Sequence, residues 1–294
     1  MSLRSEKVKS LLGINLDDLT DDKLKELGSE ILKSKIHGIC FSLYDGEQQP
    51  GDFVSDEQIK RRLDILKPHT DWIRTFSAID EHARIAEIAS DMGFKTLVGA
   101  WLSDNLKSND NEIEGLLKLS AKGLVNVAAV GNEVIYRKEL KEEQLIAYIN
   151  QVKENINNVP VGYVDAYYEF RDRPNITNAC DVILANCYPF WEGCAAEYSF
   201  LYMKDMYNEA LKASNGKKVI ITETGWPSMG SKLWGAHPSY RNYLKYFINA
   251  QLWSKDQEID MFYFSSFDES WKVEAEGDVG AYWGLWDKDE VIKF

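Results

Sequence analysis

Two glutamates, each at the end of an apolar run, are the residues of this chain best suited to chemistry. The largely apolar run 125–130 leads to Glu133, and the run 219–221 leads to Glu223. Alternate side chains of an extended strand share a face, so each glutamate is expected on the face that carries its apolar neighbours. A carboxylate on a buried face is unfavourable unless it lies at an opening and has a task there. The two runs therefore predict a catalytic pair that converges from different strands.

A pair of carboxyl groups about 5–5.5 Å apart can cleave a glycosidic bond with retention of configuration. One group attacks the anomeric carbon, while the other protonates the leaving oxygen and later deprotonates the incoming acceptor. The proton donor needs a raised pKa, which burial and an ionised neighbour can supply. The alternative is a structural role for each glutamate, as a strand-end ion pair or a helix N-cap partner. Two glutamates in such similar contexts favour catalysis.

The elements that would position these glutamates alternate regularly along the chain. Short apolar runs predict strands at 36–44, 72–77, 95–101, 125–132, 160–165, 181–188, 218–223 and 260–267. Amphipathic patterns predict helices at 17–34, 55–67, 79–91, 110–121, 138–156, 197–213 and 238–254. Ser55, with Gln58 three residues later, is typical of a capping box. Only the connection 166–179 lacks a clear helical pattern.

Strands joined by crossovers of this length predict an α/β fold, a single (β/α)8 TIM barrel. About 250 residues are typical of such a barrel, whose active site lies at the carboxyl ends of the strands. Glu133 would then end the fourth strand and Glu223 the seventh, across the mouth from each other. A doubly wound open sheet is the alternative, but no glycine-rich phosphate loop follows an early strand. We expect one domain over 1–294, with 1–35 as an N-terminal helical extension.

The composition narrows the class of partner. The 294 residues carry a formal net charge of −13 at pH 7, which disfavours nucleic acid and anionic membranes as partners. No stretch approaches the roughly 18–20 uncharged apolar residues that span a bilayer, and the first residues lack the apolar core of a signal peptide. The localisation therefore stays open between an intracellular protein and one whose leader has been left off. The oligomeric state is also open.

Neither a metal nor an organic cofactor is expected. The four cysteines (40, 180, 187 and 194) form no Cys-x-x-Cys pair and no Cys/His cluster, although a bridge between Cys187 and Cys194 is possible. Two carboxyl groups would themselves supply both the nucleophile and the proton. Nine tryptophans and fifteen tyrosines instead suit a ligand with apolar faces and polar edges.

Longer stretches around both glutamates resemble a known enzyme family. Val-Gly-Asn-Glu-Val-Ile-Tyr-Arg at 130–137 and Thr-Glu-Thr-Gly-Trp-Pro-Ser at 222–228 are similar to the two signature stretches of glycoside hydrolase family 17. This family comprises β-1,3-glucanases and β-1,3-glucanosyltransferases. Supporting similarities run from about residue 36 to the end, in the segments 40–44, 73–76, 186–190, 267–272 and 282–287. The resemblance implies a barrel with catalytic residues on strands four and seven, acting on β-1,3-glucan through a covalent glycosyl-enzyme intermediate.

The resemblance also implies roles for the residues within the signature stretches. Glu133 would be the acid/base, Glu223 the nucleophile, and Asn132 would hold the sugar ring or its 2-hydroxyl. Arg74, on the second strand, would either orient a catalytic carboxylate or form an internal ion pair.

Further substrate-binding candidates come from inward-facing positions near the strand ends. Tyr44, Asn186 and Tyr188 would bond sugar hydroxyls or steady the nucleophile, or else only complete the barrel rim. Glu269 and Lys272, after the eighth strand, would contact either the sugar or each other. Tryptophans at four strand ends could stack on pyranose rings, and of these Trp191 and Trp271 are the expected platforms, ahead of Trp101 and Trp226.

The leading hypothesis is thus a retaining glycoside hydrolase or transglycosylase whose substrate is a β-1,3-glucan polysaccharide or oligosaccharide. Extracellular or cell-wall action would suit that substrate. One alternative is a barrel glycosidase that acts on another β-glucan or on mannan, since catalytic glutamates do not encode linkage. A non-catalytic carbohydrate-binding protein on the same fold is the other, and the presence of both carboxylates counts against it.

Overall fold

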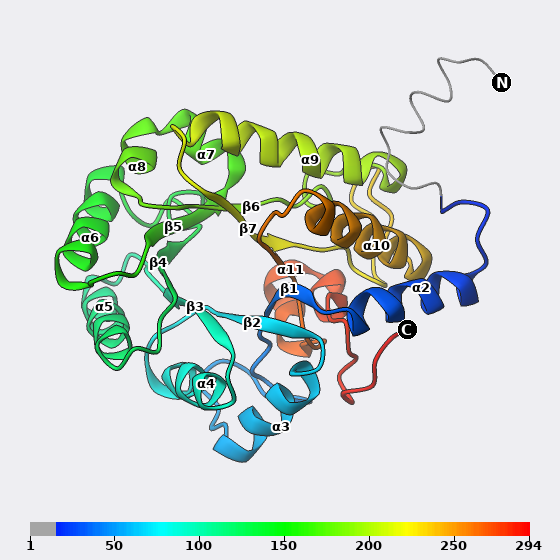
Figure 1. Ribbon diagram of the computed structural model, residues 1–294, viewed down its shortest axis with the longest axis horizontal. Helices are drawn as coiled ribbons and strands as arrows, with labels where there is room; N and C mark the ends of the chain where they lie inside the picture. The colour runs from blue at the N-terminus through cyan, green and yellow to red at the C-terminus, as the bar shows by residue number, and fades with distance from the viewer. Residues whose placement is uncertain (1–15) are drawn as a thin grey trace.

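The fold is a closed parallel barrel, described for residues 16–294 by a computed structural model (Figure 1). Within these residues eight strands pair in chain order, and the last strand pairs with the first. The strands are β1 (Ile36–Cys40), β2 (Thr70–Thr75), β3 (Lys95–Ala100), β4 (Val127–Asn132), β5 (Val161–Ala166), β6 (Ile183–Asn186), β7 (Val219–Thr224) and β8 (Met261–Tyr263). The predicted (β/α)8 barrel is confirmed.

Helices form a ring outside the barrel, and one further short helix after β8, α11 (Val273–Glu276), lies inside this ring in the view of Figure 1. The helices of the ring are α2 (Asp21–Lys33), α3 (Asp56–Leu66), α4 (Asp80–Asp91), α5 (Leu106–Ala121), α6 (Glu142–Asn155), α7 (Tyr167–Asp172), α8 (Pro174–Ala179), α9 (Ala196–Ala213) and α10 (Tyr240–Asp256). Most begin and end within a few residues of the predicted patterns. The start of α5 was predicted too late, because the Asn105 side chain caps this helix by accepting a hydrogen bond from the Ser108 amide at 3.2 Å.

The connection 166–179, predicted to lack a helix, contains α7 and α8. Each of them spans only six residues, fewer than two turns, which is too short to display a 3.6-residue period. Pro174 occupies the first turn of α8, where its missing N–H has no intrahelical partner to lose. Arg173 precedes it with a φ of −131°, outside the helical region, because a proline disfavours helical backbone before it.

The helix before β1 packs against α10. Arg241 Nη1 lies 2.6 Å from Asp21 Oδ1, and Arg241 Nη2 donates to the carbonyl of Leu19 at 2.8 Å. Gly28 faces the ring of Phe294, so the last residues of the chain also contact this helix. Residues 1–15 of the predicted extension lie outside the described residues.

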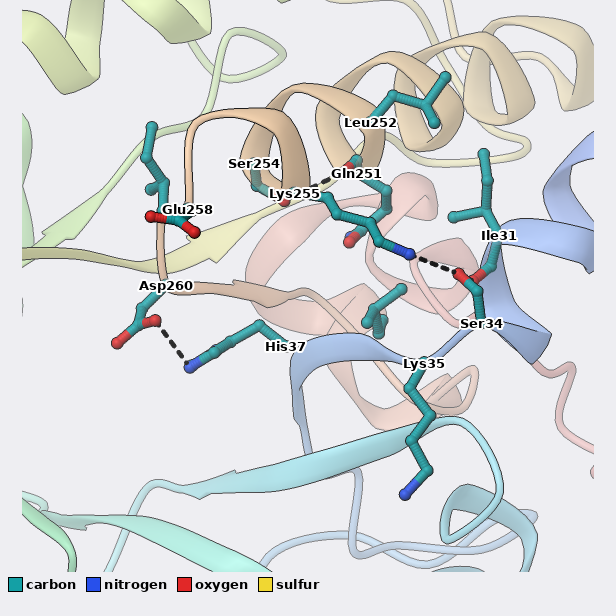
Figure 2. A pocket seen from close by; sticks show the side chains of 12 residues that line it. Ile31, Ser34, Lys35, His37, Gln251, Leu252, Ser254, Lys255, Glu258 and Asp260 are labelled. Atoms are coloured by element: carbon teal, nitrogen blue, oxygen red, sulfur yellow. Dashed lines mark hydrogen bonds and ion pairs between the residues drawn. The ribbon is translucent and has the colours of Figure 1, made fainter.

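A hollow of about 310 Å³ lies between α2, α10 and the beginnings of β1 and β8 (Figure 2). His37 Nε2 is 3.2 Å from Asp260 Oδ1, and Lys255 Nζ donates to Ser34 Oγ at 3.3 Å. Because these residues lie where the strands begin, the hollow is at the end of the barrel opposite to the expected active site.

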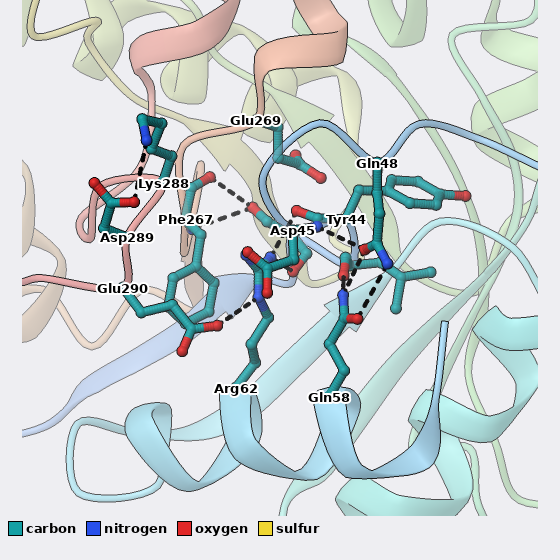
Figure 3. A network of polar contacts seen from close by, with 12 residues as sticks. Tyr44, Asp45, Gln48, Gln58, Arg62, Phe267, Glu269, Lys288, Asp289 and Glu290 are labelled. Atoms are coloured by element: carbon teal, nitrogen blue, oxygen red, sulfur yellow. Dashed lines mark hydrogen bonds and ion pairs between the residues drawn. The ribbon is translucent and has the colours of Figure 1, made fainter. Parts of the chain in front are cut away.

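The loop after β1 is held by side chains of α3 (Figure 3). The Ser55 hydroxyl accepts from the Gln58 amide at 3.2 Å, which is the first half of the predicted capping box. The second half is absent, because Gln58 Oε1 accepts from Gln48 Nε2 at 3.2 Å instead of from the Ser55 amide, while Gln58 Nε2 donates to the Leu43 carbonyl at 3.1 Å. Gln58 therefore fixes the loop that leads to the barrel mouth rather than its own helix end.

Candidate active site

Glu133 reaches the barrel mouth because the chain departs from regular strand geometry at the end of β4. Gly131 has a φ of +86° and Glu133 a φ of +54°, and the pairing with β5 shifts between Ala129 and Asn132. In a continuous strand, residues 132 and 133 would point to opposite faces. Here both side chains join one cluster. The prediction that strand alternation places Glu133 was therefore wrong: a left-handed turn places it.

Glu223 lies on β7, is only 6% exposed, and accepts hydrogen bonds on both carboxylate oxygens. Arg74 Nη1, from β2, donates to Oε1 at 2.7 Å, and the Tyr188 hydroxyl donates to Oε2 at 2.8 Å. The other guanidinium nitrogen of Arg74 donates to Asn132 Oδ1 at 2.7 Å. An ionised carboxylate only accepts hydrogen bonds, so donors on both oxygens fit a negatively charged Glu223.

The side chain of Asn186, at the end of β6, joins the two glutamates. Its Nδ2 donates to Glu133 Oε1 at 2.8 Å and to Glu223 Oε1 at 3.1 Å. The Thr222 hydroxyl donates to Asn186 Oδ1 at 2.9 Å, which fixes the orientation of the amide. Because Glu133 Oε1 and Glu223 Oε1 both accept a hydrogen bond from Asn186 Nδ2 at these distances, the two oxygens lie close together. Their separation is shorter than the separation of about 6.5–9.5 Å between the carboxyl groups of inverting glycosidases.

The two glutamates differ in their surroundings, and Glu133 is the one suited to hold a proton. Burial, followed by the negative charge of Glu223, raises the pKa of Glu133 to about 7. The Asn186 hydrogen bond and the more distant Arg74 charge oppose this rise only in part. A carboxyl group with such a pKa can donate a proton near neutral pH, whereas an ordinary glutamate is ionised there.

The backbone after Glu133 is anchored by a buried pair on β5. The Tyr163 hydroxyl bonds the Asp165 carboxylate and accepts from the Ile135 amide at 2.9 Å. The Tyr136 amide also donates to Asp165, at 3.3 Å. Burial raises the pKa of Asp165 to about 6. Sequence reasoning missed this pair, since both residues lie on a strand that carried no motif.

A cavity of about 510 Å³, here called the glutamate cavity, opens at the carboxyl ends of the strands. Besides Glu133 and Glu223, it is lined by the predicted residues Asn186, Tyr188 and Trp191.

The remaining predicted binding residues gather beside the glutamate cavity rather than along its wall. Lys272 Nζ lies 2.6 Å from Glu269 Oε2, and the Trp271 indole donates to Glu269 Oε1 at 3.2 Å. Tyr44 packs edge-on against Trp271 at 5.8 Å, and Figure 3 shows Tyr44 and Glu269 from the side of α3. The ammonium of Lys272 lies 4.3 Å from the ring centre of Phe264, which does line the cavity. Glu269 and Lys272 thus contact each other next to the site.

The four tryptophans at the strand ends differ in exposure. Trp191 is 37% exposed, lines the glutamate cavity and packs against Trp283 at 5.5 Å. Trp271 is partly buried, and Trp101 is 38% exposed. Trp226 is fully buried, so its indole has no face for a sugar. Of the two expected platforms, only Trp191 lines the cavity.

Besides Glu133, Glu223 and Glu192, the carboxyl group of Glu276 lines the glutamate cavity, and sequence reasoning missed it. Glu276 ends α11, and burial raises its pKa to about 7, with Lys272 opposing and Glu223 adding to the rise. Within the described residues, neither its Oε2 nor the indole N–H of Trp283 has a hydrogen-bond partner. The segment is irregular, and the similar stretch 267–272 ends before it, so no pattern marked Glu276.

No metal-binding arrangement of three or more His, Cys, Asp or Glu side chains occurs among residues 16–294. All four cysteines are free thiols, so the possible Cys187–Cys194 bridge is not formed. In the same part of the chain, every helix is too short or too polar to cross a membrane.

The chain is similar to several known proteins. The BtgE/BtgC glycoside hydrolase domain matches it over residues 38–284. A glucan 1,3-β-glucosidase of Candida albicans is 26% identical, covering 79% of this chain and 83% of its own. One from Arthroderma benhamiae is 28% identical over 86% of this chain and 88% of its own. Among solved structures, the glycoside hydrolase family 17 β-1,3-glucanosyltransferase of Rhizomucor miehei superposes with a TM-score of 0.81. It is 28% identical over 89% of this chain and 96% of its own, and an active-site mutant of it has been solved with laminaritriose.

Proposed function

Because the chain belongs to the BtgE/BtgC glycoside hydrolase domain family, and with it to glycoside hydrolase family 17, we propose that it cleaves β-1,3-glucan by a retaining mechanism. It is accordingly a β-1,3-glucanase or a β-1,3-glucanosyltransferase. Extracellular or cell-wall action is part of the same proposal, supported by the fungal relatives that act on glucan.

The observation that carries the mechanism is the Asn186 amide held between two unlike carboxyl groups. Glu223 attacks the anomeric carbon, and its new C–O bond replaces the glycosidic bond. Glu133 gives its proton to the departing oxygen and is left as a carboxylate. In the second step Glu133 takes a proton from water or from a sugar hydroxyl, whose oxygen then displaces Glu223. The second step thus returns both carboxyl groups to their starting states.

The surrounding residues support this proposal by their contacts. Arg74 and Tyr188 hold the Glu223 carboxylate on both oxygens, so it needs little reorganisation before it attacks. We assign Asn132 and Asn186 to the sugar in the cleaved position, because both amides lie in the same cluster. Trp191 is assigned to a neighbouring sugar ring.

Tyr44, Glu269, Trp271 and Lys272 are assigned to a sugar on the other side of the catalytic pair. This assignment is supported by their position beside the glutamate cavity, where they contact one another. Lys272 connects them to the cavity wall through the ring of Phe264.

The experiment that tests the roles uses a β-glucoside with a good leaving group and the variants Glu133→Gln and Glu223→Gln. Attack on such a substrate needs no proton donor, but the second step still needs the base. Glu133→Gln should therefore accumulate a sugar covalently attached to Glu223, detectable as a mass increase of the protein and its peptide. Glu223→Gln should show no such adduct. Adduct formation in Glu223→Gln, or unaltered turnover in both variants, would remove the assignment.

Product analysis with laminari-oligosaccharides separates the two fates of the intermediate. Products longer than the substrate show transfer to a second sugar, and exclusively shorter products show hydrolysis. A parallel panel of β-1,4-linked and mixed-linkage glucans and of mannan tests the linkage.

A further inference from the structure

Trp234 is the most exposed large hydrophobic residue in the described part of the chain. Its side chain is 77% exposed, and its φ of 49° lies in the left-handed region that bulky residues rarely adopt. Such a residue persists only where the surrounding structure holds it in place, and outliers of this kind cluster at binding sites. Both the exposure and the backbone conformation of Trp234 therefore call for an explanation.

The tip of the loop between β7 and α10 is a tight turn with Trp234 at its corner. Leu233 and Ala236 exchange two backbone hydrogen bonds, at 2.9 and 2.8 Å, and form an antiparallel bridge. Trp234 and Gly235 are the two residues between them. The turn thus fixes the backbone position of Trp234.

Hydrogen bonds to two neighbouring segments hold this loop in place. Ser231 bonds the Asp278 carboxylate through its backbone amide at 2.9 Å and its hydroxyl at 2.8 Å. The Gly235 amide donates to the Gly193 carbonyl at 3.1 Å. A Cβ added at Gly193 would collide with the Trp234 indole, so the ring lies directly on the backbone of Gly193. The exposed tryptophan is therefore held against the loop that follows β6.

That neighbouring loop forms part of the glutamate cavity. Trp191 and Glu192 both line the cavity, and Gly193 is the next residue. The Cα atoms of Trp191 and Gly193 can be no more than about 7 Å apart. Trp234 consequently lies just outside the cavity wall that carries the exposed indole of Trp191.

We propose that Trp234 is a distal sugar platform, on which a pyranose ring of a β-glucan chain stacks after leaving the glutamate cavity past Trp191. The inference rests on the proposed function, since it assumes a glucan in that cavity. An indole suits a ligand with apolar ring faces and polar edges, and an uncharged polysaccharide is not repelled by a chain of net charge −13. Because the turn is already fixed, little conformational entropy is lost when the sugar binds.

The test compares Trp234→Asn, Trp234→Phe and the control Leu211→Gln. Asparagine tolerates the left-handed backbone, so the turn keeps its shape without the indole. Phenylalanine keeps a flat ring. Leu211 is an exposed apolar residue of α9 outside the glutamate cavity. For each variant, kcat/KM is measured on laminari-oligosaccharides of three and of six sugars, and thermal unfolding confirms that the fold is retained.

Trp234→Asn is expected to lose about tenfold more kcat/KM on the hexasaccharide than on the trisaccharide. Trp234→Phe should lose clearly less, and Leu211→Gln should show no dependence on length. Equal losses at both lengths in Trp234→Asn, or none, would overturn the platform while leaving the proposed function intact. A wild-type protein that turns over neither oligosaccharide would overturn the proposed function, and the platform with it.

Discussion

At the scale of single residues, the two glutamates are made unequal by their neighbours. Glu223 receives Arg74 and Asn186 on Oε1 and Tyr188 on Oε2, whereas Glu133, among residues 16–294, receives only the Asn186 amide. Burial and the Glu223 charge then raise the pKa of Glu133 to about 7. Glu133 therefore keeps its proton near neutral pH, while Glu223 accepts hydrogen bonds on both carboxylate oxygens. This asymmetry is what a proton donor and a nucleophile require of two chemically identical side chains.

The raised pKa of Glu133 predicts the alkaline limb of the activity profile. The first step needs Glu133 protonated, so kcat/KM should fall above about pH 7, approaching tenfold for each further pH unit. The dependence of kcat/KM on pH, measured with laminari-oligosaccharides, checks this decline. With an activated aryl glucoside the limb should weaken, because the leaving group departs without a proton. If Glu133→Gln retains turnover with the same alkaline limb, another group must be responsible.

At the scale of elements, strand and helix positions followed from local pattern, while the irregular segments did not. Apolar runs marked all eight strands of the described chain, because parallel strands buried on both faces are nearly continuously apolar. The short helices α7 and α8 were missed, since six residues cannot display a helical period. The irregular backbone at the end of β4 was also missed. Gly131 and Glu133 there adopt left-handed backbone, which strand alternation does not foresee.

Replacement of Gly131 by alanine tests whether that irregular backbone positions the acid/base. A φ of +86° is unfavourable for alanine, and its Cβ would approach the Tyr163 ring at 3.3 Å. We expect a loss of about 1–2 kcal/mol in stability and about a tenfold or greater fall in kcat.

Gly123→Ala is the matched control for this substitution. Gly123 has a similar φ of +75°, but nothing lies within 4 Å of an added Cβ, and it precedes β4 at the far end. Urea unfolding and steady-state kinetics should show a comparable loss of stability with kcat retained. An equal loss of kcat in both variants would mean that the irregular backbone does not act locally on Glu133.

At the scale of the whole molecule, several acids are buried with raised pKa values. Burial is the largest cause in each: it takes Glu133 and Glu276 to about 7, and Asp165 and Asp268 to about 6. Their stabilising contribution is fully present below the unfolded-state pKa, near 4, and is lost as pH rises through the folded-state pKa. The pKa of Asp260 is instead lowered to about 2, so this residue changes the free energy of unfolding only at acid pH.

The free energy of unfolding should consequently fall between pH 5 and pH 8. The shift at Glu133 alone corresponds to an effect on the order of 3 kcal/mol. Urea unfolding at both pH values checks this, and Glu133→Gln should flatten the decline by about that amount. Repulsion among exposed carboxylates also lowers the free energy of unfolding as the pH rises. Repeating the measurement in high salt screens this repulsion. A decline that vanishes in high salt would assign the effect to surface charge instead.

Several expectations about the whole molecule stay predictions. These are the single domain over 1–294 with its extension 1–35, and the absence of nucleic acid and membranes among the partners. The net charge of −13 supports the second expectation, because it repels both kinds of polyanionic surface.

The sequence by itself determined the barrel class and singled out residues 133 and 223, because apolar runs and signature stretches are read from neighbours along the chain. Only the tertiary structure decided what surrounds them. Arg74 arrives from β2, Asn186 and Tyr188 from β6 and its end, and Glu276 from a short helix after β8. Closing the barrel brings these distant segments to one mouth, and the burial created there raises the pKa of Glu133. Neither effect is encoded in any short stretch of residues.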